Sequence, residues 1–169
     1  RLLSIPLALL ILLLAAIAWS GSSVPKRADF TFALQRDVIA LDPNQMSYGQ
    51  DIRLASGIWE GLYVYHPQTL EPIPGVAKSC DVSPDKKLYT FHLRDGVTFE
   101  SGNPMTADDV VFSLQRVVDK AGCQQYVLTT GQEDAIKSIK KVDGQTVRIV
   151  LGKPDPLFLQ LLAQTGNGV

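Results

Sequence analysis

The sequence has few residues with metal-binding or nucleophilic chemistry. Its 169 residues include two histidines and two cysteines, and neither His66 nor His92 has a second metal ligand at helical or strand spacing. There is no Gly-x-Ser-x-Gly elbow, no phosphate loop ending in Lys-Ser or Lys-Thr, and no His-Glu-x-x-His pair. These absences argue against the common hydrolase, nucleotide-binding and metalloprotease classes. We therefore expect no catalytic residue, no metal ligand and no cofactor.

An excess of basic charge is also absent. Lys and Arg number 16 against 17 Asp and Glu, so the formal net charge is -1, whereas nucleic-acid binders usually carry a basic excess or basic runs. We expect no nucleic-acid partner. The hydrophobic fraction of 46% and the charged fraction of 20% are ordinary for a globular chain.

The apolar residues are concentrated at the start of the chain. Arg1 precedes an apolar run over residues 2–19, and small residues follow it. This order is typical of a secretory signal, with Ala16-Ile17-Ala18 fitting its cleavage pattern. We expect residues 1–20 to be a signal peptide and residues 21–28 a linker. The alternative is an uncleaved membrane anchor, since the run is just long enough to span a bilayer.

The remainder has the pattern of an α+β domain with small antiparallel hairpins. A helix is expected to begin at Asp51 and continue past Trp59 until Gly61, and a second helix is expected from Thr106. Asp143-Gly144 is a favoured hairpin turn. Alternating apolar residues predict strands at 29–34, 62–65, 80–82, 88–94, 139–142 and 147–151.

The second helix has the clearest local signals. Thr106 and Asp109 are spaced as a capping box with Asp in place of Glu. Its predicted buried stripe should pack against the face of the preceding strand that carries Tyr89, Phe91 and Leu93. The stripe consists of Val110, Leu114, Val117 and Val118.

Two questions stay open at the level of single residues. Cys80 and Cys123 could form a disulfide in an exported protein, but Cys80 also suits a buried free thiol. Trp59, Tyr63 and Tyr65 could line an apolar ligand pocket or belong to the core.

Motif spacing then shows a resemblance to a known family. Residues 74–85, 89–99 and 102–113 closely resemble the family 5 extracellular solute-binding proteins, the peptide- and nickel-binding receptors of bacterial ABC importers. Shorter matches lie at 41–43, 59–62, 139–143 and 153–159. Cys80 stands where the family usually has Trp, and Leu88 and Ser101 are further departures.

The resemblance implies an α/β fold, a two-lobed clamp like the type II periplasmic-binding proteins. Residues 29–169 would be its truncated N-terminal part, with the first strands of lobe one and an extra α+β domain. The implied function is that of a periplasmic or otherwise extracytoplasmic subunit that captures peptides and delivers them to permease subunits of an ABC importer, without catalysis. The alternatives are a receptor for nickel or another small solute, or a secreted or tethered enzyme fragment with catalytic residues beyond residue 169.

The same resemblance implies where the ligand would bind. In the peptide-binding relatives, the segment before the 41–43 match runs alongside the bound peptide, so its backbone can pair with an extended ligand of any sequence. The alternative is that this loop only connects two elements. The expected ligand-binding residues are Gln35, Arg36, Asp37, Val38 and Ile39, followed by the weaker candidates Tyr48, Gln125 and Tyr126.

Overall fold

The computed structural model describes residues 37, 40–46, 48–119, 128–129, 135–164 and 168. The chain divides into two units, residues 1–34 and residues 35–169. The predicted signal peptide, the linker and the strand at 29–34 lie outside the described residues.

The second unit is built on a four-stranded antiparallel sheet of order β3-β4-β6-β5. Two hairpins form it, β3 (Ala77–Val82) with β4 (Leu88–Leu93) and β5 (Ile136–Asp143) with β6 (Thr146–Leu151). Both hairpins were predicted, and β3 and β5 begin earlier than expected. The second hairpin joins the first by pairing β6 with β4, so that Phe91 lies opposite Val147.

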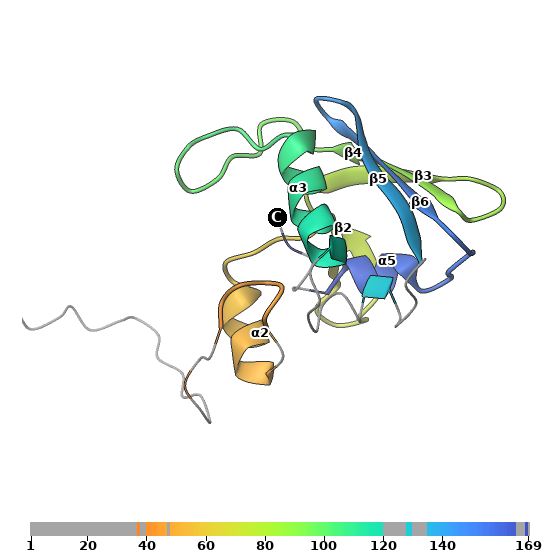
Figure 1. Ribbon diagram of the computed structural model, residues 1–169. Helices are drawn as coiled ribbons and strands as arrows, with labels where there is room; N and C mark the ends of the chain where they lie inside the picture. Colours follow the sequence, from red (N-terminus) through yellow and green to blue (C-terminus); the bar gives the residue numbers. More distant parts are fainter. Residues whose placement is uncertain are drawn as a thin grey trace, which may run out of the picture. The chain divides into compact units, whose positions relative to one another are not determined.

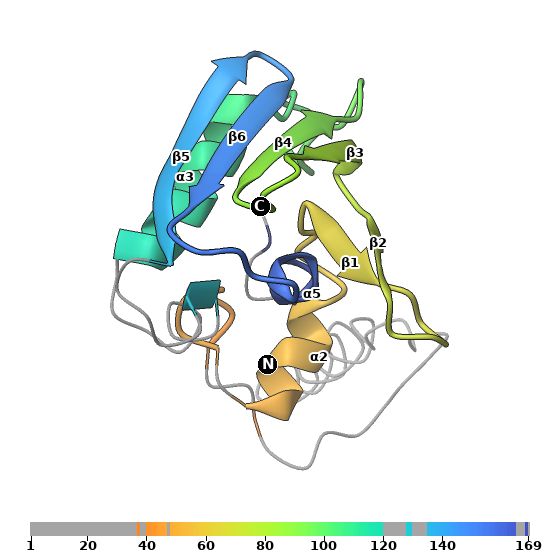
Figure 2. The same ribbon diagram turned by 90° about the vertical axis from the view of Figure 1, so that its right-hand side faces the viewer.

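Helix α3 (Ala107–Asp119) packs on one face of this sheet, against β5 and β6 (Figures 1 and 2). Its predicted capping box is present, because the Asp109 carboxylate accepts hydrogen bonds from the Thr106 amide and hydroxyl, each at 2.8 Å. The first helical amide, of Ala107, donates to the carbonyl of Gly144 in the β5–β6 turn at 3.1 Å. The helix is therefore fixed at its N-terminus to the hairpin that it covers.

The core lies between α3 and the sheet. The predicted alternation in β4 is confirmed, with Tyr89, Phe91 and Leu93 buried and the residues between them half-buried. The Tyr89 ring stacks near Phe91 and packs against Phe158 of the short helix α5 (Phe158–Leu162), at a centroid distance of 4.8 Å. The predicted stripe of α3 is buried at Val110, Leu114 and Val117, and Val118 is half-buried.

A separate two-stranded ribbon, β1 (Tyr63–Tyr65) with β2 (Pro72–Pro74), leads into the sheet. The sequence predicted β1 but only turns at β2, because of its prolines. Hydrogen bonds from Gly75 to Leu62 and from His66 to Glu71 flank the pairing, so alternation places both prolines at positions that need no donor.

The first helix differs from its prediction. Helix α2 covers Gly49–Ala55 and follows Tyr48 rather than Asp51, whose side chain is buried in the first turn. The Ser56 hydroxyl donates to the Arg53 carbonyl at 2.8 Å as the helix ends. Trp59 therefore lies beyond the helix, and the expectation that Gly61 ends it was wrong.

Candidate functional site

The structure describes two of the eight expected ligand-binding residues. Asp37 is exposed, and Tyr48 is 46% exposed just before α2. The other six, Gln35, Arg36, Val38, Ile39, Gln125 and Tyr126, lie outside the described residues. Their grouping into one ligand site stays a prediction.

The segment that follows the expected ligand loop is a tight turn over residues 41–46, which we call the anchor turn. The Asp42 carbonyl accepts hydrogen bonds from the amides of Gln45 at 2.9 Å and Met46 at 3.2 Å, and its carboxylate accepts one from the amide of Asn44 at 3.1 Å. Met46 and Asn44 are fully buried. The turn signal at Asp42-Pro43-Asn44 is confirmed.

An ion pair joins the anchor turn to α3. Arg116 donates from Nη1 to Oδ1 of Asp42 at 2.7 Å and from Nη2 to Oδ2 at 2.5 Å. The hydrogen bond with Asp42 raises the pKa of the Arg116 guanidinium. Such a bidentate contact fixes both the orientation of the carboxylate and its distance from the guanidinium. The sequence did not indicate this pair, since the two residues are 74 positions apart.

Trp59 makes a second link to the anchor turn. Its indole Nε1 donates to the carbonyl of Leu41 at 3.2 Å, and its side chain is half-buried. Trp59 is therefore not a core residue, and it lines two cavities described below. Of the two tyrosines left open with it, Tyr63 is in the core, and Tyr65 is exposed and donates to the carbonyl of Gln160 at 2.8 Å.

One of the cavities lined by described residues adjoins the anchor turn. Its volume is about 190 Å³, and Pro43, Trp59 and Arg116 line it together with Phe112, which is 69% exposed. The apolar residues that line this cavity therefore lie beside the Arg116–Asp42 ion pair, at the C-terminal half of α3.

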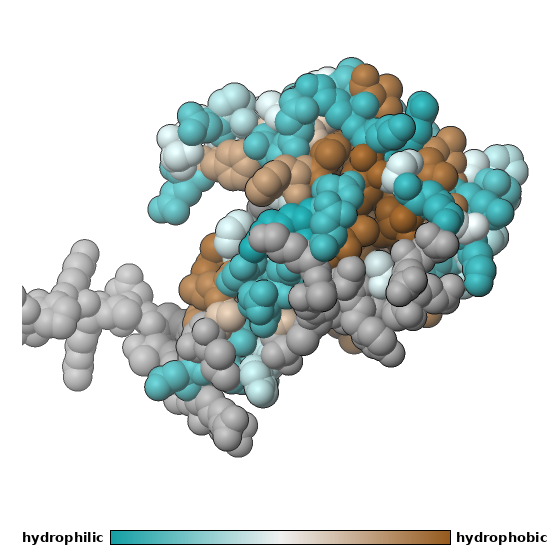
Figure 3. Space-filling model, in the orientation of Figure 1, coloured by the Kyte–Doolittle hydropathy of each residue, from teal (hydrophilic) through white to brown (hydrophobic). Residues whose placement is uncertain are grey.

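A larger cavity of about 460 Å³ lies between the residues after α2 and the loop before α3. Figure 3 shows this face hollowed there, with apolar residues above and below. Among the described residues that line it, the charged ones are Glu60 and Glu100. Its other described lining residues are Ile58, Trp59, Val76, Val97, Thr98, Phe99, Ser101 and Met105.

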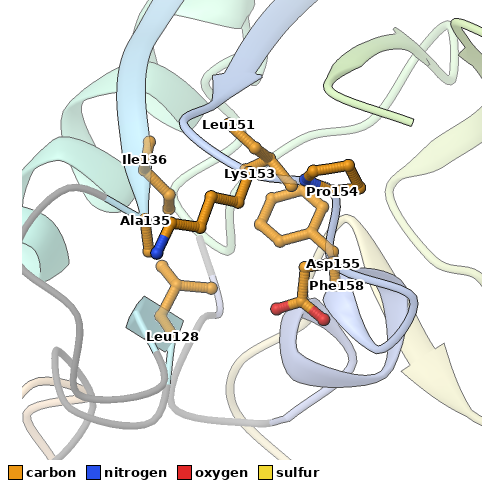
Figure 4. A pocket seen from close by; sticks show the side chains of 8 residues that line it. All are labelled: Leu128, Ala135, Ile136, Leu151, Lys153, Pro154, Asp155 and Phe158. Carbon is orange, nitrogen blue, oxygen red and sulfur yellow. The ribbon is translucent and has the colours of Figure 1, made fainter. Parts of the chain in front are cut away.

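Another cavity, of about 200 Å³, lies between β5, β6 and α5 (Figure 4). Its floor is apolar, and the Lys153 side chain extends toward Ala135. The Asp155 carboxylate accepts a hydrogen bond from the amide of Leu157 at 2.8 Å, which forms an Asx turn just before α5. The sequence pointed to residues 153–159 only through the family resemblance.

Both histidines make local contacts. The His66 ring nitrogen Nδ1 accepts from the amides of Gln68 and Thr69, and the His92 Nε2 lies 2.8 Å from the Asp81 carboxylate. No group of three or more potential metal ligands occurs in the described part of the chain. His92 lies on the open face of β4, as expected.

Cys80 carries a free thiol. Burial, followed by the negative charge of Asp81, raises the pKa of this thiol to about 12, so it is a poor nucleophile at neutral pH. Cys123 lies outside the described residues, as does the apolar run over 2–19. Among the helices described, none is long and apolar enough to cross a membrane.

Comparison with known proteins connects these features to one family. A family model described as "Bacterial extracellular solute-binding proteins, family 5 Middle" matches residues 71–169. The chain is 37% identical over 123 residues to di/tripeptide-binding protein 4 of Pseudomonas aeruginosa, covering 64% of this chain and 23% of that protein. It is 31% identical over 163 residues to the periplasmic oligopeptide-binding protein OppA of Escherichia coli, covering 88% of this chain and 30% of OppA.

A solved structure of a peptide-binding protein is also similar to this chain. The periplasmic binding protein DppA from Helicobacter pylori, in complex with the peptide STSA, superposes with a TM-score of 0.69 at 31% identity, over 79% of this chain and 29% of DppA. The expected fold class is thereby confirmed. The chain spans between 23% and 30% of the length of these proteins. It belongs to the family 5 bacterial extracellular solute-binding proteins.

Proposed function

We propose that this protein is the extracytoplasmic subunit of an ABC importer that captures peptides and presents them to the permease. The observation that carries the proposal is the family match over residues 71–169, with relatives named for binding di-, tri- and oligopeptides. The anchor turn is consistent with it, because a firmly held backbone segment suits recognition through main-chain hydrogen bonds. No observation in the described residues favours nickel over peptides.

The ligand contacts in this part of the protein come from residues 35–39, and Tyr48 forms part of the wall of the binding pocket. Their backbone N–H and C=O groups pair with an extended peptide. Side chains then add little selectivity, which suits a receptor that accepts many sequences. These residues come just before the anchor turn in the sequence. The ligand is therefore bound next to a turn that is held by hydrogen bonds from Arg116 and Trp59.

The binding site is tested on the complete gene product by calorimetry with di-, tri- and tetrapeptides, and with Ni²⁺ as the alternative solute. We expect peptides to bind and Ni²⁺ not to bind. Replacing Asp37-Val38 by Gly-Pro removes one backbone donor from the loop and should weaken peptide binding. Lys86→Gly is the control, because Lys86 has a φ of 54° that glycine adopts readily.

These measurements distinguish the peptide-binding proposal from its alternatives. Binding of Ni²⁺ alone would replace the peptide proposal, and an unchanged affinity in the folded Gly-Pro variant would move the site away from residues 35–39. The proposal assigns no catalysis. Mass spectrometry should therefore recover the bound peptide intact after prolonged incubation, whereas a cleaved peptide would favour the enzyme alternative.

A further inference from the structure

The loop between β1 and β2 is held by a histidine side chain. Residues 66–71 form this loop, and Figure 2 shows it extending beyond the ends of the two strands. At its base, the amide of His66 donates to the carbonyl of Glu71 at 2.8 Å. Inside the loop, Nδ1 of His66 accepts hydrogen bonds from the amides of Gln68 at 3.3 Å and Thr69 at 3.2 Å. The imidazole therefore has the role that an Asp or Asn side chain has in an Asx turn.

These two hydrogen bonds define the protonation state of His66. Both partners are backbone N–H donors, so the ring atom that faces them must be a nitrogen with a free lone pair. The proton of the neutral ring is then on Nε2. A protonated imidazole is a donor at both nitrogens and accepts neither amide. Uptake of one proton by His66 thus removes both hydrogen bonds at once.

The backbone beside these contacts is strained. Leu70 has a φ of 58°, in the left-handed region that residues with a Cβ atom rarely adopt. The Leu70 amide donates to the carbonyl of His66 at 2.9 Å, so this conformation is part of the same turn. The Leu70 side chain is 67% exposed, and its burial therefore does not offset the strain. Such strain persists only where neighbouring contacts hold it, so loss of the two His66 contacts favours opening of the loop.

Few titratable groups face His66 from the elements around it. The strand β2 (Pro72–Pro74) and the helix α5, which packs against β1, carry no charged side chain. On β1, Tyr63 is in the core, and the Tyr65 hydroxyl donates to a carbonyl of α5 at 2.8 Å. Glu71, at the far end of the loop, forms no ion pair with His66 among the described residues. No described carboxylate is therefore in place to bind the protonated ring.

We propose that His66 is a pH-sensitive switch of the β1–β2 loop. With a neutral ring, His66 holds the loop closed and Leu70 in its strained, exposed conformation. Imidazole is the side chain whose charge changes between about pH 8 and pH 5. As the pH falls through this range, both hydrogen bonds to Nδ1 are lost and the loop opens. The switch goes beyond the proposed function and does not depend on it.

The second histidine of the chain provides an internal control. Nε2 of His92 lies 2.8 Å from the Asp81 carboxylate, and a protonated imidazole donates to a carboxylate. Acid should therefore preserve the contact of His92 while it removes those of His66. We expect His92→Gln to leave the pH response of the β1–β2 loop unchanged.

The test is hydrogen exchange of residues 66–71 in the complete gene product, expressed as protection factors at about pH 8 and about pH 5.5. His66→Asp is the comparison variant, because Asp accepts the same amides in an Asx turn and stays ionised over this range. At the higher pH, the loops of the two proteins should be protected equally, within about twofold. At the lower pH, the unmodified loop should be protected about tenfold less than that of His66→Asp. His66→Ala should show the lower protection at both pH values.

Equal protection of the unmodified protein and His66→Asp at the lower pH would overturn the switch. A pH response that persists in His66→Ala, or one that disappears in Glu71→Gln, would overturn it as well. Loss of protection in β4 together with the loop would show unfolding of the sheet rather than opening of the loop, and would also count against it. If His66→Asp does not fold, a nitrogen NMR spectrum of the imidazoles decides alone. It should show the His66 proton on Nε2 at about pH 8, and a proton on Nδ1 would contradict the proposal.

Discussion

Among the described glycines, Gly75 has the least room for a side chain. A Cβ atom there would lie 2.4 Å from the carbonyl oxygen of Gly61 and 3.3 Å from that of Leu62. The same two carbonyls accept the amides of Val76 and Gly75, each at 3.0 Å. The close approach joins the β1–β2 ribbon to the start of the sheet, and only glycine permits it.

Gly75→Ala should therefore lower the free energy of unfolding by about 1–3 kcal/mol, as overpacking against backbone atoms does. Gly144→Ala is the control, because a Cβ at Gly144 meets nothing within 4 Å and should change stability by less than about 0.5 kcal/mol. Urea denaturation of both variants measures the difference. Equal stability of the two variants would show that the 61–75 contact relaxes without cost.

The Cys80 thiol gives a prediction about pH. Its pKa of about 12 in the folded protein exceeds the ordinary value of 9.0, so the folded state keeps the proton where the unfolded state releases it. This contribution to stability is complete below pH 9 and is lost as the pH rises through 12. At pH 8 we expect iodoacetamide to modify Cys80 at least about tenfold more slowly in native than in urea-unfolded protein. Peptide mapping distinguishes Cys80 from Cys123, and equal rates would contradict the buried thiol.

At the scale of secondary structure, α3 contributes Ala107, Val110, Leu114 and Val117 to the core. Its buried stripe contacts the same sheet face that carries Phe91 and Val147, both fully buried. Phe112, on the same helix, is 69% exposed. The helix therefore offers a buried and an exposed apolar side chain for direct comparison.

Leu114→Ala should destabilise the protein by about 2–5 kcal/mol, because it leaves a cavity at a position that is 1% exposed. Phe112→Ala should cost less than about 0.5 kcal/mol. Thermal and urea unfolding of the two variants test the orientation of the helix. A loss below about 1 kcal/mol for Leu114→Ala would fall outside the range for buried leucines and would place the stripe at the surface.

At the scale of the whole molecule, the family assignment and the N-terminal apolar run together give a prediction about export. The relatives are described as periplasmic or extracellular, and the apolar run over 2–19 ends in small residues. We predict that the mature protein begins between Trp19 and Gly21. N-terminal sequencing of the exported protein measures this directly. Retention of residues 7–17 in a membrane fraction would instead establish an anchor.

The sequence by itself determined the elements whose signals are local. The turn signal at Asp143-Gly144, the Thr106–Asp109 cap and the alternation around Phe91 each act over a few residues, so both hairpins and α3 could be predicted. The turn itself lies one residue later than predicted, at Gly144-Gln145, because Asp143 still pairs with Thr146. Each family motif is likewise a short stretch of consecutive residues, and the spacing of these motifs identified the family. The ligand-binding role of residues 35–39 came from that resemblance alone and stays a prediction.

Only the tertiary structure decided the features that join distant parts of the chain. The partner of Asp42 is 74 residues away, and nothing near either residue specifies the pairing. β2 forms despite its prolines because its ribbon requires no donor from them, and Gly75 is required by the carbonyl of Gly61. Residue pattern encodes backbone periodicity, whereas these contacts depend on which surfaces meet when the core packs, and that choice is made by the whole chain.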